Sequence, residues 1–187
     1  MITRLLAPLL VVVPVAADAQ AGAEPLDGRI ELIGEAPSAC VVRGPEAAVG
    51  VNATFAPLGA SAGQVRITEL VDPATALPRA ASMDLAMPVI CNGPHRVVVR
   101  SANGGLRRDG QPAIPGPFAE FVAYQLNSAW GDQSRQLDNS GNGPLIIDSA
   151  TARAGSLLLS INLVAGGRPL VAGNYQDQIV VEVQAAN

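Results

Sequence analysis

Few residues in this chain carry side chains that could do chemistry, and no motif groups them. His95 is the only histidine among the 187 residues, and Cys40 and Cys91 are the only cysteines. A histidine that acts as a general base must lie within hydrogen-bond reach of the proton that it removes. No nucleophile motif adjoins His95 in the sequence. We therefore expect a histidine at the surface or at a strand edge, no catalytic residue and no bound cofactor.

Acidic residues offer two further candidate sites. The stretch from Asp138 to Ser149 begins like a calcium-binding loop, but its twelfth position is Ser149, where such a loop needs a bidentate glutamate. A plain Asn-Gly turn explains the stretch better than a calcium site does, so we expect no metal there. Asp132 and Asp138 could in principle form a carboxylate pair for glycoside hydrolysis. Nothing in the sequence places them across a cleft.

Two residues could bear a carbohydrate in different ways. Trp130 could stack on a sugar ring, but the chain has one Trp, two Tyr and three Phe, and its core needs those rings. We expect Trp130 to pack in the core or at its rim. Asn52 begins an N-glycosylation sequon, Asn-Ala-Thr. We expect this sequon to be unused.

The first residues have the pattern of a secretory signal peptide. Arg4 gives a short positive region, Leu5 to Ala16 form an apolar run, and small residues allow cleavage after Ala19 or Ala21. The apolar run is shorter than the roughly 20 residues that cross a bilayer. We expect residues 1–21 to be removed and the mature chain to be exported. The alternative is an N-terminal anchor that is retained.

Export bears on the two cysteines. Cysteines of exported proteins usually pair, and no C-x-x-C motif indicates a redox or metal site. We therefore expect a disulfide between Cys40 and Cys91. Chain-entropy estimates give a closed loop of about 50 residues a stabilisation of roughly 4 kcal/mol.

The charge pattern excludes two classes of partner. The formal net charge is −4, and no cluster of basic residues occurs beyond Arg107-Arg108. A protein that binds nucleic acid or an anionic membrane presents a basic patch or stripe. We expect neither partner.

Apolar residues recur with a period of two along most of the chain, which is the period of a strand with one buried face. Gly, Pro, Asn and Asp separate the runs, as in turns and loops. The pattern predicts one all-β sandwich of about seven short strands. The predicted strands are residues 26–33, 49–55, 83–91, 95–102, 121–127, 155–164 and 175–184.

Three stretches carry finer expectations. Pro88 lies inside the run 83–91 and favours an edge strand or a bulge there. Residues 67–82 hold the only helical candidate, of one or two turns. The run 49–55 is expected to place four alternate residues on one face: Val49, Val51, Ala53 and Phe55.

From Gly28 onward, several motifs follow a recognisable order. A strand led by Cys40 precedes Thr-Phe-Ala-Pro-Leu-Gly at 54–59, and a second strand ends in Cys91. The stretches 97–108, 122–132 and 172–183 follow; the most specific parts are the Tyr…Trp-Gly-Asp motif and the closing Gly-x-Tyr-x-Asp. This order resembles the spore coat protein U domain, the fold shared by subunits of archaic chaperone–usher pili.

The resemblance implies an immunoglobulin-like β-sandwich that lacks its final strand. A periplasmic chaperone would first fill the empty position, and the N-terminal extension of a neighbouring subunit would replace it after delivery to an outer-membrane usher. The implied donor-strand residues are Leu26, Gly28, Ile30 and Leu32. The implied acceptor-groove strand carries Tyr175, Ile179, Val181 and Val183.

The expected protein is a structural subunit of a secreted surface pilus that supports adhesion or biofilm formation. Its partners would be the chaperone, the usher and neighbouring pilin subunits of the same or another kind. Residues 22–35 would be the donor-strand extension and 36–187 the pilin domain. Alternatively, residues 26–33 fold back to complete their own sandwich. The chain would then be a secreted binding or coat protein that recognises a glycan or a surface through end loops such as 101–117.

Overall fold

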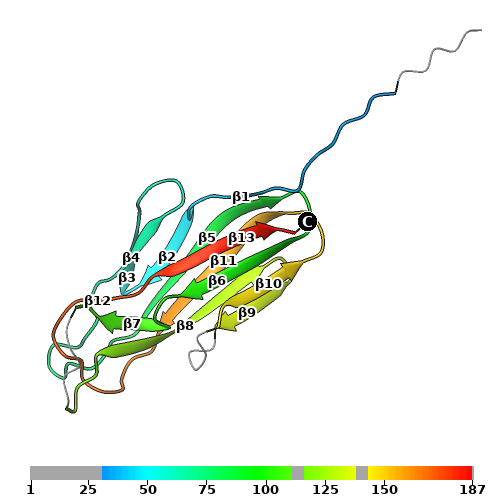
Figure 1. Ribbon diagram of the computed structural model, residues 1–187. Coiled ribbons are helices and arrows are strands. Elements are labelled where there is room, and N and C mark those ends of the chain that lie inside the picture. The colour runs from blue at the N-terminus through cyan, green and yellow to red at the C-terminus, as the bar shows by residue number, and fades with distance from the viewer. Residues whose placement is uncertain (1–30, 111–115, 138–142, 187) are drawn as a thin grey trace, which may run out of the picture. The chain divides into compact units, whose positions relative to one another are not determined.

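The computed structural model describes residues 31–110, 116–137 and 143–186 (Figure 1). The chain divides into two units, residues 1–35 and 36–187. In the first unit, residues 31–35 form no strand and are exposed. The predicted signal peptide and the predicted donor residues Leu26, Gly28 and Ile30 lie outside the described residues.

The described part of the second unit is all-β, with no helical residue. Its strands are more numerous than the sequence pattern predicts, and several of them have only two to five residues. Their bounds are β1 Cys40–Val42, β2 Ala47–Val51, β3 Ala53–Pro57, β4 Gly63–Ile67, β5 Ala81–Cys91, β6 His95–Ser101, β7 Gly105–Arg108, β8 Phe121–Trp130, β9 Gln133–Leu137, β10 Leu145–Ser149, β11 Arg153–Leu163, β12 Tyr175–Gln176 and β13 Ile179–Ala185.

The strands form antiparallel sheets that share one core. The largest sheet has the order β1-β5-β11-β8-β7-β12, with β2 also pairing with β5 and β9 with β8. A three-stranded sheet has the order β10-β6-β13, and β3 and β4 form a separate hairpin. Alternate residues of both larger sheets point into the same apolar cluster, as the period of two predicts. The fully buried members include Val89, Val97, Val99, Leu126, Ile147 and Leu157.

Pro88 lies inside the large sheet rather than at its edge. β5 pairs with β11 on one side and with β1 and then β2 on the other. The Arg43 amide donates to the Pro88 carbonyl (3.0 Å), at the interruption between β1 and β2. Proline has no N–H to donate. Because the neighbouring strand is interrupted opposite Pro88, the sheet needs no hydrogen bond from an N–H at this position. The edge-strand alternative is therefore wrong. The bulge alternative fits, because four residues (43–46) between β1 and β2 lie opposite two residues of β5 (87 and 88).

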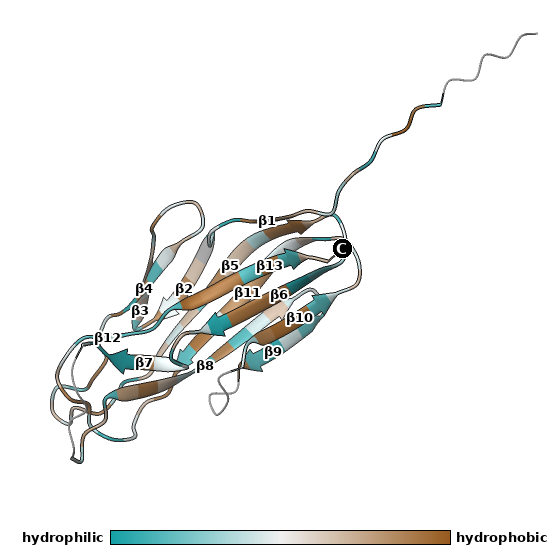
Figure 2. Cartoon of the chain, viewed as in Figure 1, coloured by the Kyte–Doolittle hydropathy of each residue, from teal (hydrophilic) through white to brown (hydrophobic). Residues whose placement is uncertain are grey.

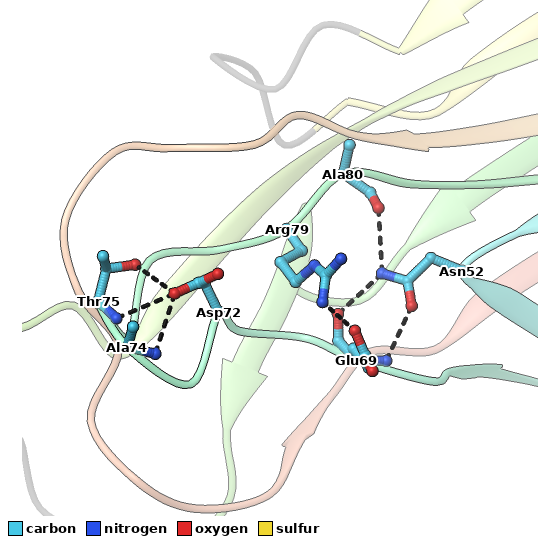
Figure 3. Close-up of polar contacts among 7 residues, drawn as sticks. All are labelled: Asn52, Glu69, Asp72, Ala74, Thr75, Arg79 and Ala80. Carbon is cyan, nitrogen blue, oxygen red and sulfur yellow. Dashed lines mark hydrogen bonds and ion pairs between the residues drawn. The ribbon is translucent and has the colours of Figure 1, made fainter.

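The predicted strand 49–55 is broken at Asn52. Asn52 has φ of 53°, a left-handed conformation that asparagine adopts more readily than most residues. Its side-chain amide donates to the backbone oxygens of Glu69 (2.8 Å) and Ala80 (3.0 Å), and its Oδ1 accepts from the Glu69 amide (Figure 3). These bonds join the corner between β2 and β3 to the segments after β4 and before β5.

The break at Asn52 changes which side chains share a face. Val49 and Val51 of β2 are 70% and 68% exposed, whereas Ala53 and Phe55 of β3 are partly buried against the core. The expectation that these residues share one face is wrong, because a single left-handed residue ends the alternation between them.

The helical candidate at 67–82 is a tight loop. The Asp72 carboxylate accepts hydrogen bonds from the amides of Ala74 and Thr75 and from the Thr75 hydroxyl (Figure 3). These bonds, with that of Ala74 the largest contribution, lower the pKa of Asp72. One turn closes when the Ala76 amide donates to the Asp72 carbonyl (2.8 Å), and Ala76 itself has φ of 55°. The left-handed residue stops the helix after that turn.

None of the described residues belongs to a helix that is long and apolar enough to cross a membrane.

Candidate functional site

The last strand, β13, forms one edge of the three-stranded sheet. Within the described part of the chain it pairs with β6 and with no other strand. β1 lies close to it, and the Ser38 hydroxyl donates to the Ala186 carbonyl just beyond its end (3.4 Å). An unpaired edge strand presents a row of N–H and C=O groups to whatever approaches it.

The residues that face this open edge follow from the register. The Ala102 amide donates to the Gln178 carbonyl, and the Ala186 amide donates to the Pro94 carbonyl (both 2.9 Å). Residues of an antiparallel strand alternate between exchanging hydrogen bonds with the partner and facing away from it. The backbone groups of Ile179, Val181 and Val183 therefore point away from β6.

The side chains of the same three residues contact the core but stay partly exposed. Ile179, Val181 and Val183 pack against the buried cluster, while their neighbours Val97 and Val99 on β6 are completely buried. Figure 2 shows strong hydrophobic colour over the first half of β13. An apolar strand with a free backbone edge and incompletely covered side chains is a surface to which another strand can be added.

A network of hydrogen bonds around Asp177 fixes the start of β13. Its Oδ1 accepts from the amides of Asn103 (2.9 Å) and Gln178 (2.8 Å), and its Oδ2 accepts from the hydroxyls of Ser101 and Tyr124. Burial raises the pKa of Tyr124, and its bond to Asp177 raises it further. The network holds the β6–β7 connection, β8 and β13 together. Asp177 is the Asp of the Gly-x-Tyr-x-Asp motif, so that motif was a usable signal, although the sequence pattern alone did not reveal this role.

Tyr175 lies apart from the other predicted acceptor residues. It belongs to β12, which pairs with β7, because the chain leaves its extended course at Asp177-Gln178 between β12 and β13. Its hydroxyl lies within hydrogen-bond distance of the backbone oxygens of Val171 (2.8 Å) and Ala119 (3.1 Å). Burial raises its pKa. The prediction of one continuous strand over 175–184 is wrong.

The predicted donor residues are described at one position only. The Leu32 side chain is 96% exposed, and the adjacent Ile33 is 85% exposed. Both lie in the stretch 31–39, which forms no strand.

The disulfide between Cys40 and Cys91 is present, as the sequence predicts. It joins β1 to β5 at directly opposed positions. His95 lies near it, and the three potential ligand atoms are within 4.8 Å of one another. Because both sulfurs are bonded to each other, they are not available to coordinate a metal.

His95 is buried rather than at the surface, with 2% of its area exposed. Its Nδ1 bonds to the Gly93 carbonyl (2.9 Å), and its Nε2 accepts from the Trp130 indole N–H (2.8 Å). The expectation of a surface or strand-edge histidine is wrong, because Trp130 and a backbone carbonyl satisfy both ring nitrogens inside the core. Trp130 itself is 2% exposed, which confirms its predicted packing role.

The Gly-Asp part of the Trp-Gly-Asp motif has a structural role. Gly131 and Asp132 form the two-residue turn between β8 and β9, and Gly131 has φ of 65°. Glycine is favoured at this point of a tight hairpin. Asp132 pairs with Arg153 (3.3 Å), and Asp138 lies outside the described residues, as does the start of the calcium-like stretch.

The chain also contains a G-x-S-x-G motif, which the sequence analysis did not identify. Gly59 to Gly63 reads Gly-Ala-Ser-Ala-Gly and matches the G-x-S-x-G pattern of serine hydrolases, which requires a sharp turn from a strand into a helix. Here the motif connects β3 to β4 within a hairpin. A hairpin loop is not the strand-to-helix turn that holds a nucleophilic serine, so the motif does not indicate a catalytic serine here.

Comparison of the chain with protein families, with curated proteins and with solved structures finds no match.

Proposed function

We propose that this chain is a structural subunit of a secreted surface pilus, assembled by the chaperone–usher route through donor-strand exchange. The observation that carries the proposal is the open edge of β13, where Ile179, Val181 and Val183 combine outward-facing backbone groups with partly exposed apolar side chains. Such an edge invites aggregation unless a partner covers it. A donor strand from a neighbouring subunit would complete an immunoglobulin-like sandwich that lacks its last strand.

The donor in this proposal is the N-terminal extension. Leu26, Gly28, Ile30 and Leu32 alternate with polar residues, so one face of an added strand would be apolar. Burying the three large side chains contributes about 1.5–3 kcal/mol each.

The remaining parts of the proposal concern export and partners. A disulfide is compatible with an oxidising compartment such as the periplasm. The partners would be a periplasmic chaperone that covers β13 first, an outer-membrane usher, and neighbouring pilin subunits. The protein would reach the cell surface as part of a fibre that supports adhesion or biofilm formation, and it would have no enzymatic activity.

The test is deletion of residues 22–35 from the mature chain, co-expressed with a cognate chaperone in a periplasm. Size-exclusion chromatography should show a ladder of oligomers for the full chain and a one-to-one chaperone complex for the deletion. A full chain that is a stable monomer without chaperone, together with a deletion that aggregates, would assign the extension to its own sheet. The protein would then be a self-complemented secreted binding or coat protein.

Two point variants sharpen the deletion. Ile30→Asp places a charge on the apolar face of the extension and should abolish the ladder, since burying an unpaired carboxylate is costly. Glu31→Gln changes the opposite face and should leave the ladder intact. Equal effects of the two variants would argue against strand addition.

A further inference from the structure

A second feature of the described residues lies away from β13, in the loops before β8 and after β11. An open hollow of about 720 Å³ is bordered by Phe118, Glu120, Phe121 and Arg168. Small-ligand sites commonly have volumes of about 300–1,000 Å³. The volume alone does not indicate a ligand. The charge and exposure of the side chains that border the hollow indicate which kind of ligand it could bind.

Arg168 is held in one orientation by the backbone. Its Nε donates to the Pro117 carbonyl (3.0 Å), and its Nη2 donates to the carbonyls of Gly116 (2.5 Å) and Phe118 (2.9 Å). Among the described residues, its Nη1 has no hydrogen-bond partner and no carboxylate pairs with its charge. A fixed guanidinium with unused donors is preorganised to bind an anion.

Two phenylalanine rings are exposed beside this cation. Phe118 is 46% exposed and Phe121 is 39% exposed, in a chain with only three phenylalanines. The Arg107 guanidinium lies over the Phe121 ring, 5.8 Å from its centroid. The ring of Phe118 is left as an exposed apolar surface that borders the hollow together with Arg168.

Among the described residues that border the hollow, Glu120 has the only carboxylate, and an arginine balances its charge. Glu120 forms an ion pair with Arg108 at 2.8 Å, and the Arg108 side chain is only 8% exposed. A well-buried ion pair is little screened by solvent. The hollow therefore keeps a positive character from Arg168, and Arg107 adds a second cation over the ring of Phe121, which also borders the hollow.

We propose that this hollow binds an acidic sugar residue of a polysaccharide. The sugar carboxylate would accept hydrogen bonds from Arg168 Nη1, and the apolar face of the sugar ring would lie on Phe118. One cation that borders the hollow, Arg168, and a second beside Phe121, Arg107, match a ligand with one or two negative charges. A nucleic acid would require a longer basic stripe, which the sequence lacks. This inference does not depend on the role proposed for β13.

The test is isothermal titration calorimetry of the full chain with an oligogalacturonate and with a neutral malto-oligosaccharide of equal length. We expect saturable binding of the acidic oligosaccharide, weakened by salt, and no binding of the neutral one. Equal binding of both, binding of neither, or tighter binding of a single-stranded DNA oligonucleotide would overturn the proposal.

Variants separate recognition from folding. Phe118→Ala should weaken binding by about tenfold through lost ring contact, and Arg107→Gln by about threefold at an exposed charge. Arg168→Gln should abolish binding. It also removes the hydrogen bonds that hold the backbone of residues 116–118, so thermal denaturation must show that this variant still folds. Arg135→Gln alters an exposed arginine on β9 and should leave affinity unchanged. Unchanged affinity in Phe118→Ala and Arg107→Gln would overturn the proposal.

Discussion

The two outer strands of the three-stranded sheet have the same neighbour and opposite surroundings. In β10, Leu145 and Ile147 pair with Val99 and Val97 of β6 and are 4% and 0% exposed. In β13, Val181 and Val183 pair with the same two valines from the other side, yet both remain partly exposed.

The difference lies in what stands beyond each strand. β10 lies against β9, and the Gln133 side chain donates to the Asp148 carbonyl (2.7 Å), which joins the two strands across the corner. Beside β13, the described residues include β1, which lies close to it, and the Ser38 hydroxyl, which donates to the Ala186 carbonyl. The core therefore buries the inward side chains of β10 fully and leaves those of β13 partly exposed.

The largest expected effect comes from truncating equivalent core residues on the two sides. Ile147→Ala should lower the free energy of unfolding by about 2–4 kcal/mol, because it leaves a cavity in a closed core. Val183→Ala should cost about 1 kcal/mol, because its side chain is incompletely covered. Urea denaturation of the full chain at a concentration where it is monomeric measures both. Equal costs would mean that the β13 side is already sealed.

Proline substitutions test the direction of the backbone groups on β13. Val180→Pro removes an N–H that faces β6 and should destabilise the domain by about 3 kcal/mol. Val181→Pro removes an N–H that faces the open edge, and proline is tolerated there. We expect Val181→Pro to keep most of the stability, measured by denaturation, and to lose oligomer formation, measured by size exclusion. Oligomers that persist in Val181→Pro would show that the edge is not where strands add.

A smaller effect concerns the anchor at the start of β13. Asp177→Asn removes the charge that four donors share and should cost about 1–3 kcal/mol. Asp148→Asn is the matched control on the closed side, since Asp148 makes an exposed ion pair with Arg96, and it should cost less than about 1 kcal/mol. Thermal denaturation of both variants gives the comparison. If Asp148→Asn costs as much as Asp177→Asn, the network does not anchor β13.

The smallest effect is a pH dependence in the alkaline range. The pKa of Tyr124 is raised in the folded chain above its ordinary value of 10.0, so the folded state holds this proton more tightly than the unfolded state. The resulting stability is present below pH 10 and is lost as the pH rises toward the folded pKa, by up to about 1.4 kcal/mol per pH unit. Tyr124→Phe should flatten this part of the profile in denaturation between pH 9 and 11. An unchanged slope would exclude Tyr124 as its source.

The local pattern predicted much of the fold. The alternation in 83–91, 95–102 and 155–164 matches β5, β6 and β11 to within two residues at each end, because a strand with one buried face needs this period. The pairing of Cys40 with Cys91 followed from there being only two cysteines. The strands β4, β7, β9 and β10 were missed, since each is only four or five residues long and such runs are too short for a period to stand out.

Of the four residues predicted for one acceptor strand, the structure places three in β13. Ile179, Val181 and Val183 do share a face, whereas Tyr175 belongs to a different strand because the Asp177 network bends the chain between them. The residues next to His95 in the sequence do not predict its burial, because its hydrogen-bond partner Trp130 is distant in the sequence. The hollow beside Arg168 could not be predicted from the sequence either, because its residues come from two segments that are distant in the chain.

The sequence by itself determined the all-β class, the disulfide and the apolar face of β13, since each depends on residue type and local spacing. Only the tertiary structure decided which outer strand of the three-stranded sheet keeps its inward side chains partly exposed. Leu145 and Val181 are both aliphatic strand residues paired with Val99, and nothing local distinguishes them. What distinguishes the two residues is the packing of the segments beside each strand, and that packing depends on parts of the chain that are distant in the sequence.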